Sequence, residues 1–464
     1  MNDLATTATP SRSQVTLSHA LAEHVAGTRY GDIPQAAREA AKLFMLDTLA
    51  VAWAGSDAPG CREAHALLVE EGGRADATAW AYGGRLPAQA AAFINGMSSA
   101  ALDYDTLGRE APVHVSISVL PAALALAERQ RSSGEDFLAA LVIGSDVMYR
   151  LGAAAAHPHR GWSYTSVFGP FGAAAAAARL MKLDTLQTRH ALGMAFIQAS
   201  GTQQANIEPS LTKRMLSALA ARSGVQAAQL AQRGLTAPTE VIEGKFGLYR
   251  LYQEGDAERL LGQLGTRFDS VDLTIKKFPS CGCNHTAVEG MLRLVREYDL
   301  QPDDVLSMEV TVTPYIERIV GGRYDPSGDA QVAAQFNIRY SMACALVRRK
   351  LGLIEIQEQA ARDPAITRHI EKISVRVDPS LATERGPVVV RLRTKHHGEV
   401  SCRIEHVPGD PQAPLTASEL DQKFAECFGL GAAPLNPEQI RIVGERVRNI
   451  ERIEDMSRFF DGVC

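Results

Sequence analysis

The chain has 464 residues, of which 46% are hydrophobic and 22% are charged, and its formal net charge at pH 7 is -5. These values are typical of a globular protein with a sizeable core and exclude a disordered chain. Two domains are expected, because single cores stop growing at roughly 250–300 residues. The mildly acidic charge provides no global basic field for nucleic acid or an acidic membrane surface, so any recognition of anions has to be local.

The N-terminal sequence MNDLATTATPSRSQ lacks the apolar segment of a signal peptide. No later stretch reaches the roughly 20 apolar residues that span a bilayer. The seven cysteines are odd in number and widely scattered, unlike those of a disulfide framework. We therefore expect a cytoplasmic protein with reduced thiols and no membrane partner.

Residues 16–271 are rich in alanine and leucine and have helical spacing almost throughout. The stretch PQAAREAAKLFMLDTLAVAWAG opens with proline in a first-turn position and ends on glycine, which are start and stop signals of a helix. Similar stretches, such as PAALALAERQ and FGAAAAAARLMKLD, follow along the chain. Their small side chains predict closely packed helices, several of them buried on most sides. This segment is predicted to form a large all-α domain.

The composition changes after Ser270. The segments SMEVTVTP, KISVRVDP and GPVVVRLRTKHHGEVSCRIEHVPG combine β-branched residues, alternation and turn residues, which predicts strands. Helical stretches lie between them, NHTAVEGMLRLVREYD and VAAQFNIRYSMACALVRRK. Residues 272–411 are therefore predicted to form a smaller α+β domain. Residues 412–464 return to helical patterns and are predicted to rejoin the first domain, because about 50 residues make a poor independent core.

The segment IKKFPSCGCNH, residues 275–285, brings two lysines, two cysteines and a histidine together. Its C-x-C spacing is neither that of a structural zinc site nor that of a C-x-x-C redox pair, so no metal is expected. Lys276 and Lys277 end a predicted strand, and His285 lies near the start of the next helix, where backbone N–H groups favour an anion. Such a junction is suited to a carboxylate or phosphate. The alternative is a pair of solvated lysines and a capping histidine.

A second polar segment, ALDYDTLGREAPVH, lies between two apolar helical stretches. It carries five polar candidates: Asp103, Asp105, Thr106, Arg109 and His114. Polar residues on loops held by a rigid scaffold are often functional. A histidine beside a carboxylate can act in general acid–base catalysis near neutral pH. The alternative is that Asp103 caps a helix and that His114 is a satisfied, half-buried residue.

Two further candidates stand on predicted helices. Lys213 lies close to a helix start, where a lysine is usually a surface charge. Tyr340 is a phenol on an otherwise apolar helical face, where a tyrosine usually belongs to the core.

Five groups of motifs occur in the order and spacing of one known family: LDTLAVAWAGS; LDYD followed by H and SVLPAALALAE; GWSYTSVFGPFGAAAAAARLMKLD; TKR followed by AARSGVQAAQLAQRGLT; and KKFPSCGCNHTAVEG. In these motifs, which span nearly the whole chain, the sequence resembles the MmgE/PrpD family. That family includes 2-methylcitrate dehydratase, cis-aconitate decarboxylase and iminodisuccinate epimerase. The resemblance implies a large helical domain made from the N-terminal part and the C-terminal tail, a smaller α+β lid domain, and a homodimer.

The resemblance also implies a pocket for a small polycarboxylate. Carried over by position, it assigns catalytic roles to Asp103, His114 and Tyr340. It assigns substrate binding to five further residues: Thr106, Ser163, Lys213, Lys276 and Cys281. In the implied scheme the lysines hold carboxylates, and His114, oriented by Asp103, moves a proton at the carbon next to a carboxylate. The scheme requires neither a metal nor a cofactor, and no G-x-G-x-x-G or P-loop motif is present.

Three of these motifs depart from the family pattern. Ser163 and Tyr164 stand where a His-Pro pair is common. Leu216 replaces a histidine that often follows the TKR motif, and Cys281 replaces a histidine of cis-aconitate decarboxylase. Fewer imidazoles make a decarboxylase less expected. The expected reaction is that of a hydro-lyase of the 2-methylcitrate dehydratase type. The alternatives are an iminodisuccinate-type epimerase, a cis-aconitate-type decarboxylase and an inactive helical binding protein.

Overall fold

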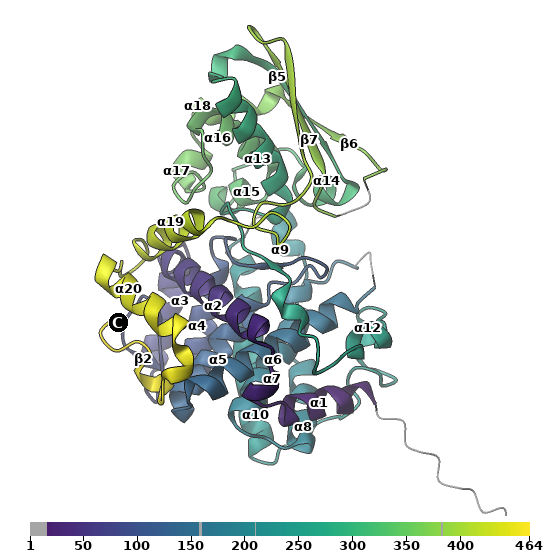
Figure 1. Cartoon of the computed structure of the whole chain (residues 1–464), viewed down its shortest axis with the longest axis vertical. Helices are drawn as coiled ribbons and strands as arrows, with labels where there is room; N and C mark the ends of the chain where they lie inside the picture. The colour runs from purple at the N-terminus through teal and green to yellow at the C-terminus, as the bar shows by residue number, and fades with distance from the viewer. Residues whose placement is uncertain (1–15, 157–159, 209, 382–383) are drawn as a thin grey trace, which may run out of the picture.

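The computed structural model describes residues 16–156, 160–208, 210–381 and 384–464. It has a large helical part, drawn below in Figure 1, and a smaller part above it that contains a four-stranded sheet. The predicted fold class, mainly α with an α+β second domain, is confirmed. The smaller part, from α13 to β8, is called the lid below.

The helical part is built from helices of both ends of the chain, because α19 and α20 of the C-terminal segment pack on α2. Its α-helices are α1 (Leu17–Gly27), α2 (Gln35–Gly55), α3 (Cys61–Glu71), α4 (Ala88–Ala100), α5 (Ser116–Gln130), α6 (Gly134–Ala153), α7 (Tyr164–Leu180), α8 (Thr185–Phe196), α9 (Gln204–Ile207), α10 (Met215–Gln232), α11 (Leu248–Leu251), α12 (Ala257–Leu261), α19 (Ala417–Phe428) and α20 (Pro437–Arg448). Four short strands accompany them: β1 (Ala77–Thr78), β2 (Arg85–Leu86), β3 (Leu107–Gly108) and β4 (Leu273–Thr274).

Helix α7 lies at the centre of the helical part, packed against α5, α6, α8 and α10. Within α7, which the structure describes throughout, Arg179 alone is not buried. The helix backbones touch: a Cβ on Gly144 of α6 would lie 2.6 Å from the carbonyl oxygen of Gly172 in α7. A Cβ on Gly224 of α10 would lie 2.3 Å from Ala173 Cβ. The alanine and glycine content noted in the sequence is therefore what allows these helices to pack so closely.

The lid consists of a sheet with strand order β6-β5-β7-β8 and helices around it. β5 runs parallel to β6 and antiparallel to β7, and β7 and β8 form an antiparallel pair. The strands are β5 (Val305–Val312), β6 (Ile373–Val377), β7 (Val388–Thr394) and β8 (Glu399–Ile404). The α-helices are α13 (Gly282–Glu297), α14 (Pro314–Val320), α15 (Ala330–Gln335), α16 (Ile338–Arg348), α17 (Glu358–Ala361) and α18 (Pro364–Thr367).

All three segments predicted to form strands do so, and the third contains both β7 and β8. The helical stretch predicted around Tyr340 is divided into α15 and α16. The break falls at Asn337, whose backbone is extended and whose side chain accepts a hydrogen bond from Tyr340 N. Asparagine favours such helix N-caps, which explains why the chain starts a new helix there.

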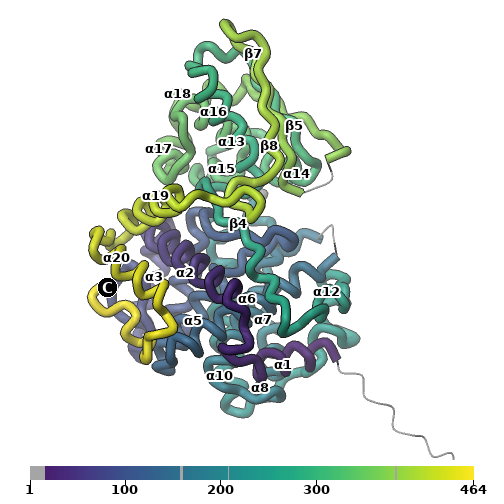
Figure 2. The backbone as a smooth tube through the Cα atoms, viewed as in Figure 1, coloured from purple at the N-terminus to yellow at the C-terminus, as the bar shows by residue number. Residues whose placement is uncertain are grey.

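The chain passes from the helical part to the lid just after β4, which pairs with β3 in antiparallel fashion, with Leu107 opposite Thr274. Figure 2 shows β4 at this junction, where the chain leaves the helical part for the lid. Lys423 of α19 is buried beneath the junction: its Nζ lies 2.6 Å from Asp47 Oδ1 and 2.9 Å from the carbonyl oxygen of Lys276. The pairing of β3 with β4 brings the loop around residue 103 beside residue 276.

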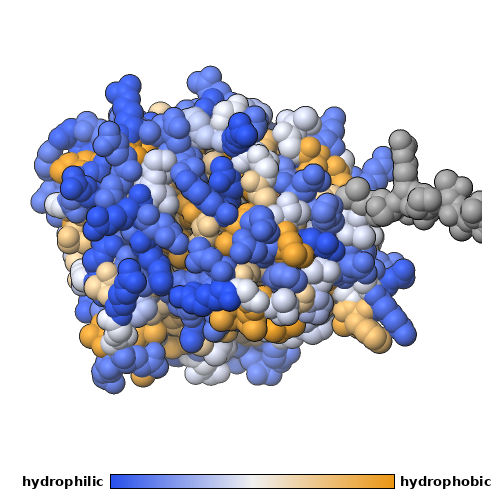
Figure 3. All heavy atoms as spheres, turned by 90° about the horizontal axis from the view of Figure 1, so that it is seen from below, coloured by the Kyte–Doolittle hydropathy of each residue, from blue (hydrophilic) through white to orange (hydrophobic). Residues whose placement is uncertain are grey.

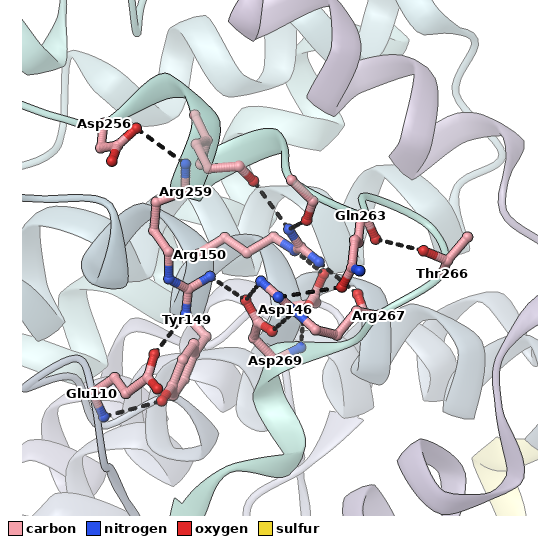
Figure 4. Close-up of polar contacts among 12 residues, drawn as sticks. Glu110, Asp146, Tyr149, Arg150, Asp256, Arg259, Gln263, Thr266, Arg267 and Asp269 are labelled. Atoms are coloured by element: carbon pink, nitrogen blue, oxygen red, sulfur yellow. Dashed lines mark hydrogen bonds and ion pairs between the residues drawn. The ribbon is translucent and has the colours of Figure 1, made fainter.

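A polar network fixes the segment that leads into β4 (Figure 4). Its centre is the ion pair between Arg150 Nε and Asp146 Oδ2 on α6, 2.6 Å apart with both side chains fully buried. The other Arg150 nitrogens donate to the carbonyl oxygens of Leu260, Gly262 and Arg267. Asp146 Oδ1 accepts from the backbone N–H of Asp269 at 2.5 Å. This network therefore holds residues 260–269 against α6.

Replacing Arg150 by methionine should lower the free energy of unfolding by about 3–5 kcal/mol, because it leaves a buried carboxylate without its cation. Burial raises the pKa of Asp146 to about 6 although Arg150 lowers it. Without Arg150, Asp146 favours its neutral form even more, so the loss should be larger at pH 8 than at pH 5. Arg267→Met is the control: its half-exposed side chain shares Asp269 with Arg259, and we expect a loss below about 1 kcal/mol. Urea unfolding of both variants measures the difference, and equal losses would contradict this account.

Hydrophilic residues cover most of the face shown in Figure 3, with apolar residues in separate patches between them. In the part of the chain that the structure describes, no helix combines the length and the apolar character needed to cross a membrane.

Candidate active site

A cavity of about 110 Å³ lies between the helical part and the lid. The helical part lines it with the segments that carry Asp103, His114 and Lys213. Residues 281–283 and Arg385 line it from the lid. Six of the eight residues assigned by resemblance line this one cavity: Asp103, His114, Ser163, Lys213, Lys276 and Cys281.

Four long helices begin at the cavity: α5, α7, α10 and α13. A residue from the first turn of each lines it, namely Ile117, Thr165, Ser217 and Gly282. The first N–H groups of a helix have no partner within the helix and carry partial positive charge. The starts of α5, α7 and α13 therefore favour an anionic ligand. Helix α10 instead continues the 3-10 helix Leu211–Arg214, and Met215 N donates to the carbonyl oxygens of that helix.

Asp103 lies between two lysines at the wall of the cavity. Lys213 Nζ donates to Asp103 Oδ1, and Lys276 Nζ lies 2.9 Å from Oδ2 and 2.8 Å from the main-chain oxygen. Burial alone would raise the pKa of Asp103, but Lys213 and Lys276 hold it well below its ordinary value. Asp103 is therefore a carboxylate, and its backbone has the left-handed φ of 50° that few non-glycine residues adopt.

Lys276 is fully buried, and burial disfavours its charged form. Asp103 and Asp105 nevertheless raise its pKa above the ordinary value, so it remains a cation. Lys213, Asp103 and Lys276 thus form a cluster with two positive charges and one negative charge.

His114 forms a pair with the buried Asp105, with 2.7 Å between Nδ1 and Asp105 Oδ2. Its backbone N–H donates to Thr165 Oγ1 at 3.0 Å, which ties the segment to the start of α7. The side chain of His114 is 21% exposed and lines the cavity. Burial raises the pKa of Asp105, but His114 and Lys276 lower it below its ordinary value. A charged Asp105 thus orients the imidazole, as carboxylates do in general acid–base sites.

The predicted orientation of His114 by Asp103 is wrong in this detail, because Asp105 makes that hydrogen bond. Asp103 instead pairs with the two lysines. The two aspartates are two residues apart on an irregular loop, so the sequence pattern alone does not distinguish their roles.

Two residues assigned by resemblance lie away from the cavity lining. Thr106 is fully buried and shares a hydrogen bond with Ser116, with 2.9 Å between their hydroxyl oxygens. The Tyr340 hydroxyl donates to the carbonyl oxygen of Glu355, and its ring stacks on Tyr324. Burial raises the pKa of Tyr340 far above its ordinary value, so the phenol stays protonated. The structure therefore places Thr106 behind the cavity wall and Tyr340 in the core of the lid.

The cysteine pair of the lid lies at the start of α13, and both thiols line the cavity. A hydrogen bond from Cys283 and the charge of Lys276 lower the pKa of Cys281, although burial and Asp103 raise it. His285 is fully buried, and burial together with Lys276 lowers its pKa to about 3. Among residues 16–156, 160–208, 210–381 and 384–464, no group of three His, Cys, Asp or Glu side chains is arranged to hold a metal ion.

Comparison with known families decides the family of the chain. The MmgE/PrpD N-terminal domain matches residues 19–260, and the MmgE/PrpD C-terminal domain matches residues 278–449. The chain belongs to the MmgE/PrpD family. The resemblance found in the motifs is thereby confirmed.

Individual MmgE/PrpD relatives are similar to the chain at low identity. The cis-aconitate decarboxylase-like protein oryM of Aspergillus oryzae is 26% identical, over 97% of this chain and 98% of the relative. The cis-aconitate decarboxylase of Aspergillus terreus is 27% identical over 70% of this chain and 71% of its own length. The cis-aconitate decarboxylase of Homo sapiens is 25% identical over 96% and 93% of the two chains.

All three positions at which a histidine of the MmgE/PrpD pattern is missing line this cavity: Ser163, Leu216 and Cys281. His114 is consequently the one histidine among the described residues that lines it. The departures therefore lie where they can change the chemistry.

Arg385 lines the cavity but was not predicted from the sequence. It stands in the polar stretch ahead of β7, where nothing in the residue pattern indicates that the side chain turns inward. The structure identifies it as an arginine that is only 8% exposed and lies beside a helix start.

Proposed function

We propose that this MmgE/PrpD protein is an enzyme that moves a proton at the carbon next to a carboxylate of a small di- or tricarboxylate. The observation that carries the proposal is that His114, which is paired with Asp105, lines the same cavity as the Lys213–Asp103–Lys276 cluster. The pair supplies a base held by a carboxylate. The cluster and the starts of α5, α7 and α13 supply positive charge for an anionic substrate.

Among the reactions of the family, we propose the elimination of water by a hydro-lyase of the 2-methylcitrate dehydratase type. His114 removes the proton next to the carboxylate, and the electron pair of that C–H bond forms the C=C bond. The hydroxyl on the adjacent carbon departs with its bonding electrons, takes the proton from the imidazolium and leaves as water. Lys213 and Lys276 stabilise the negative charge that builds on the carboxylate oxygens. One imidazole is enough for this sequence, because the proton it takes is the one it returns.

An epimerase of the iminodisuccinate type is the second candidate. Epimerisation needs a second group that delivers a proton to the opposite face of the carbon. The lowered pKa of Cys281 and its place in the cavity lining favour this thiol for that role. The cis-aconitate decarboxylase names of the relatives support a third possibility, decarboxylation. As the family resemblance implies, we also propose that the protein acts as a homodimer.

The test is a product analysis by proton NMR with 2-methylcitrate, citrate, cis-aconitate and iminodisuccinate. Loss of water from a hydroxylated acid is the result that we expect. Inversion at the carbon without loss of mass would favour the epimerase, and release of carbon dioxide would favour the decarboxylase. Failure to change any of these acids, with folding verified by circular dichroism, would overturn the proposal.

A further inference from the structure

The charges that line the cavity are not all balanced within it. Lys213 and Lys276 both pair with Asp103. Arg385 is different: it forms no ion pair with a carboxylate among the described residues. A buried cation without a counterion is costly, so an anion that reaches it from the cavity is strongly favoured.

The Arg385 guanidinium is held in place on one side only. Its Nη2 donates to the carbonyl oxygens of Gly108 at 2.6 Å and Arg109 at 2.8 Å. Its Nη1 is buried and has no hydrogen-bond partner in the described chain. A buried charged donor that forms no hydrogen bond is unfavourable, so Nη1 lacks an acceptor that a ligand can provide.

The unpaired side of Arg385 lies against the start of α13, a helix of 16 residues. A Cβ on Gly282, its first residue, would lie 3.9 Å from Nη1 and 3.8 Å from Cδ of Arg385. The atom that such a Cβ would meet first is the end of a flexible side chain, Leu107 Cδ2, at 2.9 Å. Because Gly282 has no side chain, it leaves the space beside the guanidinium free of side-chain atoms of its own. Gly282 and Arg385 both line the cavity. A cation and a helix start at the same place form an anion-binding site.

We propose that Arg385 and the first turn of α13 bind a second carboxylate of the substrate, one that takes no part in proton transfer. The inference rests on the proposed function, in which His114 and the lysines act on the first carboxylate. Nη1 is the nitrogen of Arg385 that is left to bond that group, because Nη2 already donates to Gly108 and Arg109. The site then selects acids with at least two carboxylates and discriminates against analogues in which the remote carboxylate is an amide.

The test compares Arg385→Met with the wild type on a turned-over diacid or triacid and on its analogue with the remote carboxylate amidated. The wild type should prefer the acid, and Arg385→Met should lower kcat/KM for the acid on the order of 10²-fold, mainly through KM. Turnover of the amide should change little. Arg109→Met is the control, because its guanidinium pairs with Asp272 outside the cavity lining and should leave the preference unchanged. A folded Arg385→Met that loses acid and amide activity equally would overturn the inference and indicate a purely structural role.

A second measurement covers the case in which Arg385→Met does not fold, and it does not depend on turnover. Gly282→Ala places a methyl group against the guanidinium while Arg385 keeps its own hydrogen bonds. Calorimetry with the unreactive triacid tricarballylate should show binding by the wild type and binding weakened at least about tenfold by Gly282→Ala. Undiminished binding would overturn the inference. If the wild type binds tricarballylate in this way but turns over no acid, the proposed function fails while the carboxylate site stands.

Discussion

His114→Asn is expected to lower kcat by about 10²- to 10⁴-fold, the usual contribution of a general acid–base group. The fold should persist, because the side chain is 21% exposed and its one hydrogen bond among the described residues goes to Asp105. Asparagine keeps a donor for Asp105 but cannot carry the proton. Steady-state kinetics with the substrate found by product analysis, together with thermal unfolding, measures both effects.

His190→Asn is the matched control for this prediction. His190 is partly exposed on α8, where its Nδ1 lies 3.0 Å from the carbonyl oxygen of Ala237, and it does not line the cavity. Its replacement should leave kcat unchanged. A His114→Asn variant as active as the control would show that the imidazole is not the proton carrier.

Lys276→Met should have the second largest effect, because it removes a cation from the cavity and from Asp103 together. We expect kcat/KM to fall by at least about 10²-fold, with kcat lowered and KM raised. The free energy of unfolding should fall by about 3 kcal/mol, because the buried Asp103 keeps only Lys213. Lys277→Met is the control: Lys277 is partly exposed and pairs with Glu289 and Glu419, so turnover should persist.

Lys276→Met should also change how the free energy of unfolding depends on pH in the acidic range. The pKa of Asp103 lies below its ordinary value of 3.8, so its contribution to stability is complete above that value and is lost as the pH falls below it. Without Lys276 the pKa of Asp103 is lowered less, and this acid-dependent loss should become smaller. Urea unfolding at pH 3 and pH 7 measures the slope. An unchanged pH dependence together with normal turnover in Lys276→Met would contradict the role of the cluster.

The helical part and the sheet were predictable because their signals are local. The alanine and glycine residues of α7 and α10 predict close helix packing, and the alternation of apolar and polar residues in β7 predicts a strand with one face buried. The sequence could not show that β3 pairs with β4, which sets Asp103 beside Lys276 although 173 residues separate them. The family resemblance indicated instead that Asp103 and Lys276 belong to one pocket.

The predictions about the site that were wrong or incomplete concern the direction in which a side chain points, which the residue type alone does not determine. Asp103 and Asp105 are equally good partners for an imidazole in sequence. In the structure Asp103, whose backbone is left-handed, pairs with the lysines, and Asp105 pairs with His114. Tyr340 stands on a helix whose apolar residues do not indicate which face meets the cavity. Arg385 is brought inward by two carbonyl oxygens from the distant β3 segment, a contact that no local pattern encodes.

Deuterium exchange tests the central claim most directly, namely that His114 moves a proton at the carbon next to a carboxylate. A polycarboxylate that the wild type turns over is incubated in D₂O with the wild type or with His114→Asn, and its C–H signals are followed by proton NMR. The wild type should lose or exchange one C–H next to a carboxylate, whereas His114→Asn should bind the acid and leave that C–H intact. Exchange by His114→Asn at the wild-type rate would contradict the account.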